Sequence, residues 1–244
     1  MEGPSLVILK EELSRFCGKQ ISHASGLSKI NYEQITGRKI KAFKSWGKHF
    51  LIVIGNSLAI RVHFLMFGSY RVNERKETEP RLRLQFENGD EINFYTTAVS
   101  LIDEPLDQRY DWSVDVMNEA WDAKKARKKL KQLPDMNVGD ALLDQNIFSG
   151  VGNIIKNEVL FRIHVHPDSN VGALPPRKLT ALIAEAKQYS FDFYEWKKEF
   201  TLKKHWLIFT KRKCPRCNLA AIKAYTGKTK RRSFFCTNCQ KLYT

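Results

Sequence analysis

The stretch from Lys211 to Tyr243 reads KRKCPRCNLAAIKAYTGKTKRRSFFCTNCQKLY and carries two Cys-x-x-Cys pairs. Cys214 and Cys217 form the first pair, Cys236 and Cys239 form the second, and 18 residues separate the two pairs. This spacing is typical of a zinc ribbon, in which four thiolates close a tetrahedral site that has no open position. The pattern therefore predicts one structural Zn²⁺ ion. Two disulfides are the less favoured alternative, because the sequence shows no signal-peptide pattern.

Basic and aromatic residues surround these cysteines. A ribbon of this size has little core of its own, so metal binding supplies much of its folding free energy. A basic hairpin with aromatic side chains is typical of nucleic-acid binding, although a solvated basic face has the same composition. The residues concerned are Lys228, Lys230, Arg231, Arg232, Phe234 and Phe235.

The composition of the whole chain favours the nucleic-acid interpretation. Among 244 residues, 41 are Lys or Arg and 26 are Asp or Glu, which gives a formal net charge of +15 and a pI of about 9.6. Such an excess of positive charge points to a polyanionic partner. The longest apolar run, around Phe50–Ile54, is far shorter than the roughly 20 residues of a membrane span. The remaining cysteine, Cys17, is expected to be a core thiol on an amphipathic helix, and the cysteine usage fits a cytoplasmic or nuclear, non-secreted protein.

The N-terminal half predicts one helix followed by many strands. A helix is expected over Ser5–Phe16, because apolar residues recur there on one face. From Lys39 to Leu101 the pattern changes to period two, which predicts an antiparallel sandwich or barrel. The predicted strands are Ile40–Trp46, Phe50–Ile54, Leu58–Val62, Gly68–Asn73, Arg81–Phe86, Glu91–Tyr95 and Ala98–Leu101.

A polar segment, Pro105 to Asp115, is predicted as a linker to a helical part. Between two of its helices lies a turn rich in glycine and asparagine, Gln145–Asn153. Gly150 and Gly152 let the backbone approach a phosphate closely, and Asn153 adds a side-chain donor, although many helix pairs have glycine turns without such a role. The predicted helices are Ala120–Leu133, Val138–Leu143, Ile154–Ile163 and a last one from Pro175-Pro176 to about Trp196.

Four motifs occur in an order that resembles one known family. They are Glu2-Gly3-Pro4 before a helix, Trp46-Gly47-Lys48 before a strand, LDQNIFSGVGNI at Leu143–Ile154, and RRSFFC at Arg231–Cys236. Over essentially its whole length the chain resembles the formamidopyrimidine-DNA glycosylase/endonuclease VIII family of base-excision repair enzymes. Glu2-Gly3-Pro4 is more similar to the endonuclease VIII branch. The short stretch between Tyr95 and Pro105 also lacks a loop of the formamidopyrimidine branch, and this favours oxidised pyrimidines as substrates.

The resemblance implies an α+β protein with four parts. An N-terminal antiparallel β-sandwich with an N-terminal helix is expected over residues 1–108, and residues 109–117 are expected to be a linker. A helix–two-turn–helix DNA-binding domain is expected over 118–208, and a zinc ribbon over 209–244. The family implies damaged double-stranded DNA as the partner, no membrane association, a monomer, and flipping of the damaged nucleotide out of the duplex.

The resemblance also implies the chemistry. In the family an N-terminal proline attacks the sugar, displaces the base and forms a Schiff base, after which elimination cuts the strand. Here Met1 stands in the place of proline, and its primary α-amine, with a typical pKa of about 7.7–8.0, can also form an imine. Glu2 is then the general acid and base, and Lys48 binds a phosphate and assists in catalysis.

Further roles follow from the same comparison. Asn153 and Arg231 are expected to grip the phosphates beside the flipped nucleotide. Leu65, Met66 and Phe67 occupy the segment that fills the gap left by flipping, and three apolar side chains predict weak discrimination of the opposite base. Because Met1 replaces proline, a damaged-DNA-binding protein without lyase or glycosylase activity is the alternative function. A zinc-ribbon transcription or RNA-binding factor is a third possibility that leaves the Glu2 and Lys48 motifs unexplained.

Overall fold

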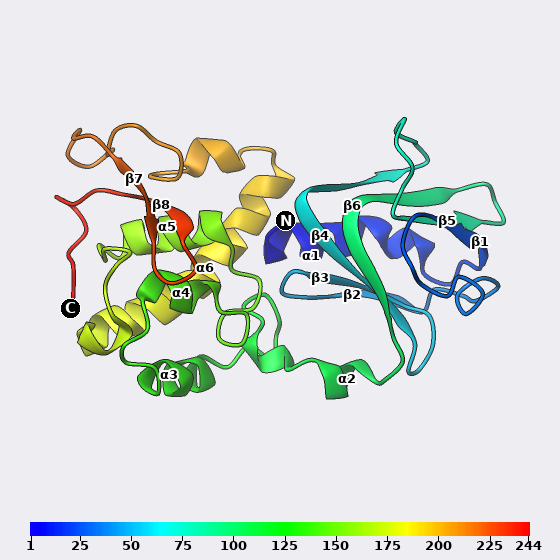
Figure 1. Ribbon diagram of the computed structural model, residues 1–244, viewed down its shortest axis with the longest axis horizontal. Coiled ribbons are helices and arrows are strands. Elements are labelled where there is room, and N and C mark those ends of the chain that lie inside the picture. The colour runs from blue at the N-terminus through cyan, green and yellow to red at the C-terminus, as the bar shows by residue number, and fades with distance from the viewer. The chain divides into compact units, whose positions relative to one another are not determined.

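The computed structural model describes residues 1–244, which divide into two compact units. The sheet unit comprises Met1 and Ser5–Asp111, and the helical unit comprises Glu2–Pro4 and Trp112–Thr244. The segment around the division holds a short helix, α2 (Leu106–Arg109), and a 3-10 turn at Trp112–Val114 (Figure 1). The finer division into four parts stays a prediction.

Six antiparallel strands form the single sheet of the sheet unit (Figure 1). Their order across the sheet is β1-β5-β6-β4-β3-β2, so that the two longest strands lie in the middle. The strands are β1 (Ile21–Ser25), β2 (Ala42–Trp46), β3 (His49–Val53), β4 (Ala59–Val72), β5 (Leu82–Phe86) and β6 (Glu91–Ile102).

The strand boundaries differ from the prediction at three places. Two predicted strands merge into β4, because its pairing with β6 stops at Phe64 and resumes at Ser69 after a register shift. Two others merge into β6 for the same reason. Strand β1 was not predicted, since only Ile21 and Ala24 are buried in it and its register is irregular, which leaves no period-two pattern.

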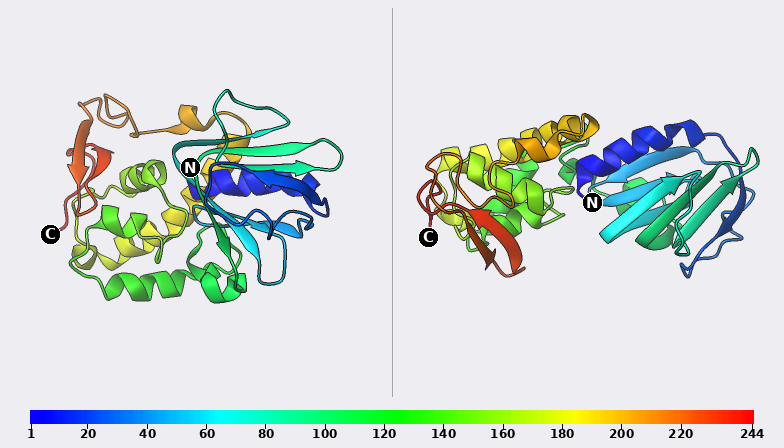
Figure 2. Two further views of the ribbon diagram at one scale, coloured as in Figure 1. Left: turned by 45° about the vertical axis from the view of Figure 1, so that its right-hand side comes forward. Right: turned by 90° about the horizontal axis from the view of Figure 1, so that it is seen from above.

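Helix α1 (Gly3–Leu13) and the 3-10 turn Ser14–Phe16 run along one face of this sheet (Figure 2). The predicted apolar face is buried in the same cluster as the inward side chains of the strands: Leu6, Leu9, Leu13, Phe16, Phe50, Ile52 and Phe94. The prediction for Cys17 is wrong. The backbone turns to an extended conformation at this residue, with ψ 136°, so its side chain leaves the helix face and is exposed.

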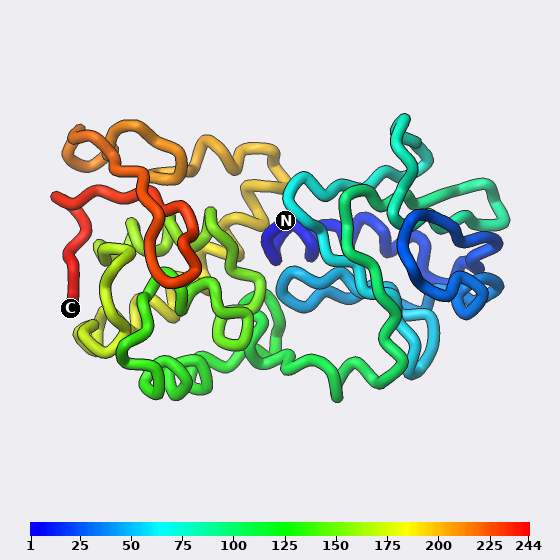
Figure 3. The backbone as a smooth tube through the Cα atoms, in the orientation of Figure 1, coloured from blue at the N-terminus to red at the C-terminus, as the bar shows by residue number.

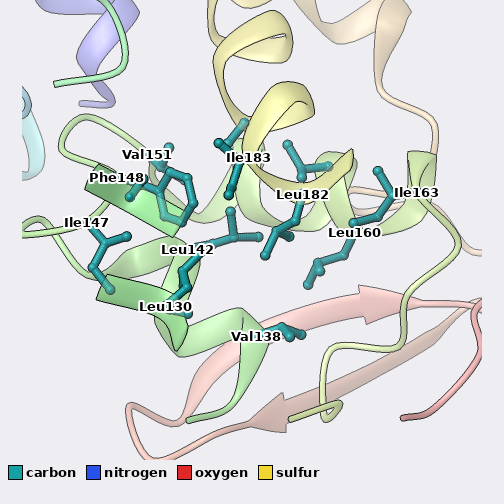
Figure 4. Packing of buried hydrophobic residues seen from close by; sticks show 14 of the residues in the cluster. Leu130, Val138, Leu142, Ile147, Phe148, Val151, Leu160, Ile163, Leu182 and Ile183 are labelled. Atoms are coloured by element: carbon teal, nitrogen blue, oxygen red, sulfur yellow. The ribbon is translucent and has the colours of Figure 1, made fainter. Parts of the chain in front are cut away.

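The helical unit is built from four helices around a second apolar core (Figure 4). They are α3 (Ala123–Lys131), α4 (Val138–Leu143), α5 (Asn153–Arg162) and α6 (Pro176–Lys198). Asp122 and Asn137 cap α3 and α4 by accepting two backbone N–H groups each, which explains why these helices begin where they do. The two predicted prolines likewise mark the start of α6.

A two-stranded ribbon, β7 (Ile222–Thr226) and β8 (Arg231–Phe235), completes the helical unit. Figure 3 traces the chain from α6 through the orange segment to this red hairpin, which returns alongside α5. Phe161 of α5 packs with Ile208, Cys214, Phe234 and Cys236, so the ribbon shares a small core with the helix. The predicted α+β class, with strands first, helices next and a cysteine ribbon last, is confirmed. None of the helices combines the length and apolar character that crossing a membrane requires.

Candidate nucleic-acid interface

Glu2 lies at the N-terminus of helix α5 in the helical unit. Its two carboxylate oxygens accept the backbone N–H groups of Ile154 at 2.7 Å and Ile155 at 3.2 Å. The N-H group of Gly3 donates to the carbonyl of Gly150 at 2.9 Å. The partial positive charge of a helix N-terminus favours an ionised carboxylate. The start of the chain is therefore held against the loop before α5, with the Glu2 carboxylate fixed in place.

The two loop glycines are explained by this arrangement. A Cβ atom at Gly152 would lie 2.4 Å from the Cγ and Cδ atoms of Glu2, so only glycine leaves room for the carboxylate. Gly150 has φ 98°, a left-handed conformation that favours glycine. The side chain of Gln145 holds the loop by donating to Leu143 and Val151 carbonyls and accepting the N–H of Gly150. Phosphate contact by Gly150 and Gly152 stays a prediction.

Asn153 and Arg231, which are 78 positions apart in the sequence, lie on neighbouring elements. Asn153 begins α5, and its side-chain amide donates to the carbonyl of Arg232 at 2.9 Å. Arg231 begins β8 and is exposed. An amide NH₂ carries two N–H groups, so the bond to Arg232 leaves a second donor on Asn153. The α5 N-terminus and the hairpin thus bring Asn153 beside the start of β8, which carries Arg231.

A buried lysine in α5 was missed by the sequence reasoning. Lys156 is 1% exposed, and its Nζ donates to the Ser233 hydroxyl at 2.8 Å and to the Arg232 carbonyl at 3.3 Å. Burial, and then the charge of Arg231, lower the pKa of Lys156 to about 8, against the opposite effect of Asp140. The available signal was a lysine placed between two apolar pairs of the same helix, Ile154-Ile155 and Val159-Leu160.

Two acidic residues also join the helices to the ribbon. Glu158 is fully buried and accepts the backbone N–H groups of Leu207, Ile208 and Phe209 at 2.7 to 2.9 Å. Burial raises the pKa of Glu158, while these three N–H groups lower it. Asp140 of α4 accepts the N–H of Lys228 at 2.6 Å at the hairpin turn. These contacts position the ribbon on α4 and α5.

The four cysteines of the ribbon converge on one point. All four Sγ atoms lie within 4.8 Å of one another, with 3.7 Å between Cys214 and Cys239 and 3.5 Å between Cys217 and Cys236. The cysteines form no disulfide. A tetrahedral site with metal–sulfur bonds of about 2.3 Å places sulfurs about 3.8 Å apart. A hydrogen bond from the backbone at Leu219 lowers the pKa of Cys217 to about 7, whereas burial raises the pKa of Cys236 and Cys239. The four thiols can therefore hold one metal ion.

In the sheet unit, Lys48 and the N-terminal amine share a neighbour. Lys48 follows Gly47, φ 52°, in the turn between β2 and β3, and its carbonyl accepts the Nδ1–H of His63 at 3.0 Å. The pKa of His63 is lowered mainly by burial and then by the positive charges of the Met1 amine and Lys48. His63 therefore lies near both predicted catalytic amines. It was not singled out from the sequence, although it lies two residues before Leu65 in β4.

Leu65, Met66 and Phe67 project from the irregular part of β4. Their exposed fractions are 47%, 74% and 87%, and they fall where the pairing with β6 is interrupted. Phe67 has φ 71°, so the strand's alternation is broken at this residue. A Cβ atom at Gly68 would lie 2.9 Å from the Thr96 carbonyl, which explains the glycine that follows. Three large apolar side chains are thus presented to solvent by a strand that is anchored on both sides.

An antiparallel sheet unit, a helix–loop–helix with a carboxylate at its second N-terminus, and a four-cysteine ribbon together define a class of zinc-finger helix–two-turn–helix proteins. Two family models match the chain. They are the formamidopyrimidine-DNA glycosylase N-terminal domain, over residues 2–97, and the formamidopyrimidine-DNA glycosylase H2TH domain, over residues 112–189. Together they span more than half of the chain, which belongs to the formamidopyrimidine-DNA glycosylase/endonuclease VIII family.

Individual relatives agree with this assignment. The chain is 30% identical to Endonuclease 8-like 3 of Xenopus laevis over 89% of this chain and 37% of that protein. It is 26% identical to the formamidopyrimidine-DNA glycosylase of Mycoplasma genitalium over 87% of this chain and 82% of that protein. The chain thus spans 33 to 37% of the length of the Endonuclease 8-like 3 proteins that it matches.

Solved structures share the fold. The Lactococcus lactis formamidopyrimidine-DNA glycosylase bound to DNA containing an AP site matches with a TM-score of 0.87 and 22% identity, over 99% of this chain and all of that one. A viral DNA glycosylase matches with a TM-score of 0.84 and 22% identity over the same shares of the two chains. The predicted family is confirmed.

Proposed function

We propose that this protein is a DNA glycosylase that removes oxidised bases, pyrimidines in particular, and then cleaves the strand as an AP lyase. The observation that carries the proposal is the Glu2 carboxylate, which is fixed on two N–H groups at the start of α5 in a space that only Gly152 leaves open. Family membership supports the glycosylase activity, and a structural relative that was solved in complex with AP-site DNA supports a damaged duplex as the partner.

The proposed reaction begins at the N-terminal amine of Met1. The neutral amine attacks the sugar C1′, the bond from C1′ to the base breaks, and the base leaves with the electron pair and takes up a proton. Glu2 accepts the proton that the attacking amine loses and donates it to the ring oxygen as the sugar opens to the imine. It afterwards removes a C2′ proton, and the 3′-phosphate leaves with the electron pair of its bond to C3′. A typical α-amine pKa of about 7.7–8.0 leaves a usable neutral fraction at pH 7.

Other residues bind the duplex in this proposal. Lys48, Asn153 and Arg231 contact phosphates, and Leu65, Met66 and Phe67 fill the space left by the flipped nucleotide. The four cysteines hold Zn²⁺, which supplies folding free energy to the ribbon and takes no part in the chemistry. The protein acts as a monomer.

The second candidate function is damaged-DNA binding without chemistry. One observation favours it: Met1 stands where the family has a proline, so a primary amine replaces the usual secondary amine. The two functions differ in whether a covalent intermediate forms on DNA.

Borohydride trapping on a duplex with one abasic site separates them. We expect a stable protein–DNA adduct, and mass mapping of the attached peptide is expected to place it on the Met1 amine. An adduct on Lys48 would move the nucleophile to that residue. Tight binding with neither adduct nor base release would refute the enzyme and establish the binding protein.

A further inference from the structure

Lys156 connects the two elements that carry Asn153 and Arg231. It lies one helical turn after Asn153 in α5, and its ammonium reaches the Arg232 carbonyl and the Ser233 hydroxyl of β8. The Arg232 carbonyl also accepts the Asn153 amide, so one backbone oxygen receives both side chains. Any movement of Lys156 is therefore transmitted to the residues on both sides of the proposed phosphate site.

Among the hydrogen bonds around the contact between α5 and β8, those of Lys156 have a charged donor. Asn157 accepts the N–H of Phe234 at 2.6 Å, and Thr226 hydrogen-bonds the Ser233 hydroxyl at 2.6 Å. Both bonds join neutral groups, whereas a bond from an ammonium is charge-assisted and about twice as strong. Loss of the Lys156 proton therefore weakens the charge-assisted connection between α5 and β8 without removing it.

We propose that Lys156 is a positioning residue for phosphate binding: its ammonium aligns Arg231 with Asn153, and DNA binding at this point is coupled to the protonation of Lys156. This inference rests on the proposed function, because it assumes that a DNA phosphate is bound beside Asn153 and Arg231. The inference concerns the position of the phosphate-binding residues and the charge of Lys156, and not which lesion is removed.

The charges around Lys156 make such coupling effective near neutral pH. Arg231 on β8 disfavours the ammonium, whereas Asp140 on α4, Glu2 in the N-terminal segment and Asp168 after α5 favour it. With burial as the main cause, the pKa of Lys156 in the DNA-free protein is about 8. A phosphate anion bound nearby stabilises the ammonium and raises this pKa, so binding above pH 8 takes up a proton.

Deprotonation of Lys156 is expected to change the stability of the fold and the affinity for DNA in opposite directions. Unfolded lysine has a pKa of about 10.4, so between about pH 8 and 10 the unfolded chain binds more protons at this position than the folded one. This group alone therefore makes the protein more stable as pH rises through that range, while its contribution to DNA affinity falls. A loss of affinity without a loss of folding is the signature of the proposed role.

The test measures proton uptake on binding by calorimetry, at pH 8.5 and constant salt, in two buffers of different ionisation enthalpy. The probe is a duplex with a tetrahydrofuran abasic analogue, which allows no imine to form. Wild type is expected to take up about half a proton more than Lys156→Met, and its Kd is expected to rise about fivefold between pH 7.5 and 9. In Lys156→Arg, which keeps a permanent charge, the Kd is expected to stay constant over this range.

Lys223→Met is the matched control, because Lys223 is an exposed cation on β7 of the same hairpin. It should weaken binding through lost charge while keeping the proton uptake of wild type. Thermal unfolding of each variant at pH 7.5 and 9 identifies misfolding. If Lys156→Met does not fold, the test rests on the constant Kd of Lys156→Arg between these pH values. Equal proton uptake in wild type and the Lys156 variants overturns the inference and leaves the proposed function intact. Failure of wild type to bind the duplex overturns both.

Discussion

The carboxylate of Glu2 combines a structural and a proposed chemical task. It satisfies two N–H groups that the first turn of α5 cannot bond internally, and it does so in the space beside Gly152. Because the helix N-terminus favours the ionised form, the group is held ready to accept a proton. Its hydrogen bonds fix the oxygen positions, which is the condition for efficient proton transfer to a bound sugar.

Replacing Glu2 with Gln tests this assignment at the residue. Gln keeps the size and one acceptor oxygen, so α5 and DNA affinity should be retained, with a Kd within about twofold of wild type. Base excision should fall by about 10²- to 10⁴-fold, since proton transfer by a positioned side chain is lost. Single-turnover excision on an oxidised-pyrimidine duplex and fluorescence anisotropy on an abasic-analogue duplex measure the two quantities. Undiminished excision would contradict the role of Glu2.

Arg231 is the exposed residue for which one phosphate contact is proposed. Arg231→Ala should weaken binding equally on different sequences and lower the slope of log K against log salt by about 0.9, because one counterion fewer is released. A titration at four salt concentrations measures that slope. Lys211→Ala, which removes an exposed cation before the first cysteine pair, is the control for general charge. A slope that is the same in wild type and Arg231→Ala would place Arg231 away from the DNA.

Helix α5 is the element on which the site depends. Its N-terminus holds Glu2, its middle holds the hairpin through Lys156 and Asn157, and Glu158 holds residues 207–209. The side chain of Arg216 in the ribbon donates to the Phe161 carbonyl at 2.7 Å, near the C-terminal end of the helix. A ten-residue helix therefore organises the loop, the hairpin and the metal ribbon together.

The sequence predicted those elements whose signals are local. The start of helix α4 was predicted at Val138–Leu143, which is the whole observed helix, and α5 was predicted within one residue at each end, because apolar periodicity and the loop between them define both. The cysteine spacing predicted four thiols at one point, and the structure brings them there. Strand β4 was split in two, since the pairing that makes it continuous involves β6, whose paired residues lie 20 to 43 positions later. Lys156 and Glu158 were missed because a charged residue in a helix normally faces solvent.

Removal of the metal tests the ribbon as an element. Cys214→Ser should lower the metal content by one equivalent, abolish DNA binding and unfold the hairpin, because the ribbon's shared core is small. The helical core and the sheet core do not include the cysteines and should stay folded. Metal analysis, far-ultraviolet circular dichroism and hydrogen exchange of the 213–241 segment report these effects. Cys17→Ser, at the exposed cysteine outside the ribbon, should change none of them. A full equivalent of metal in Cys214→Ser would exclude the four-cysteine site.

Across the whole molecule, the proposed chemistry draws on both compact units. Met1 and Lys48 belong to the sheet unit, as do the exposed Leu65, Met66 and Phe67, while Glu2 belongs to the helical unit. The net charge of +15 attracts any duplex, damaged or intact, so charge alone gives no selection for a lesion. In the proposed function, selection therefore comes from the cost of flipping a base and from what replaces it in the stack.

The apolar character of the replacing side chains leads to a prediction about the opposite strand. Leu65, Met66 and Phe67 have no hydrogen-bonding groups, so they can fill a vacated space by stacking but cannot read the edge of the opposite base. Excision of one oxidised pyrimidine should therefore proceed at rates within about threefold opposite adenine, guanine, cytosine and thymine. A duplex with no base opposite the lesion serves as the reference that corrects these rates for differences in base-pair stability. Met66→Ala should slow excision opposite all four bases to a similar extent, whereas Met66→Gln should introduce a preference among them. A preference of more than tenfold in wild type would show that another, polar group contacts the opposite base.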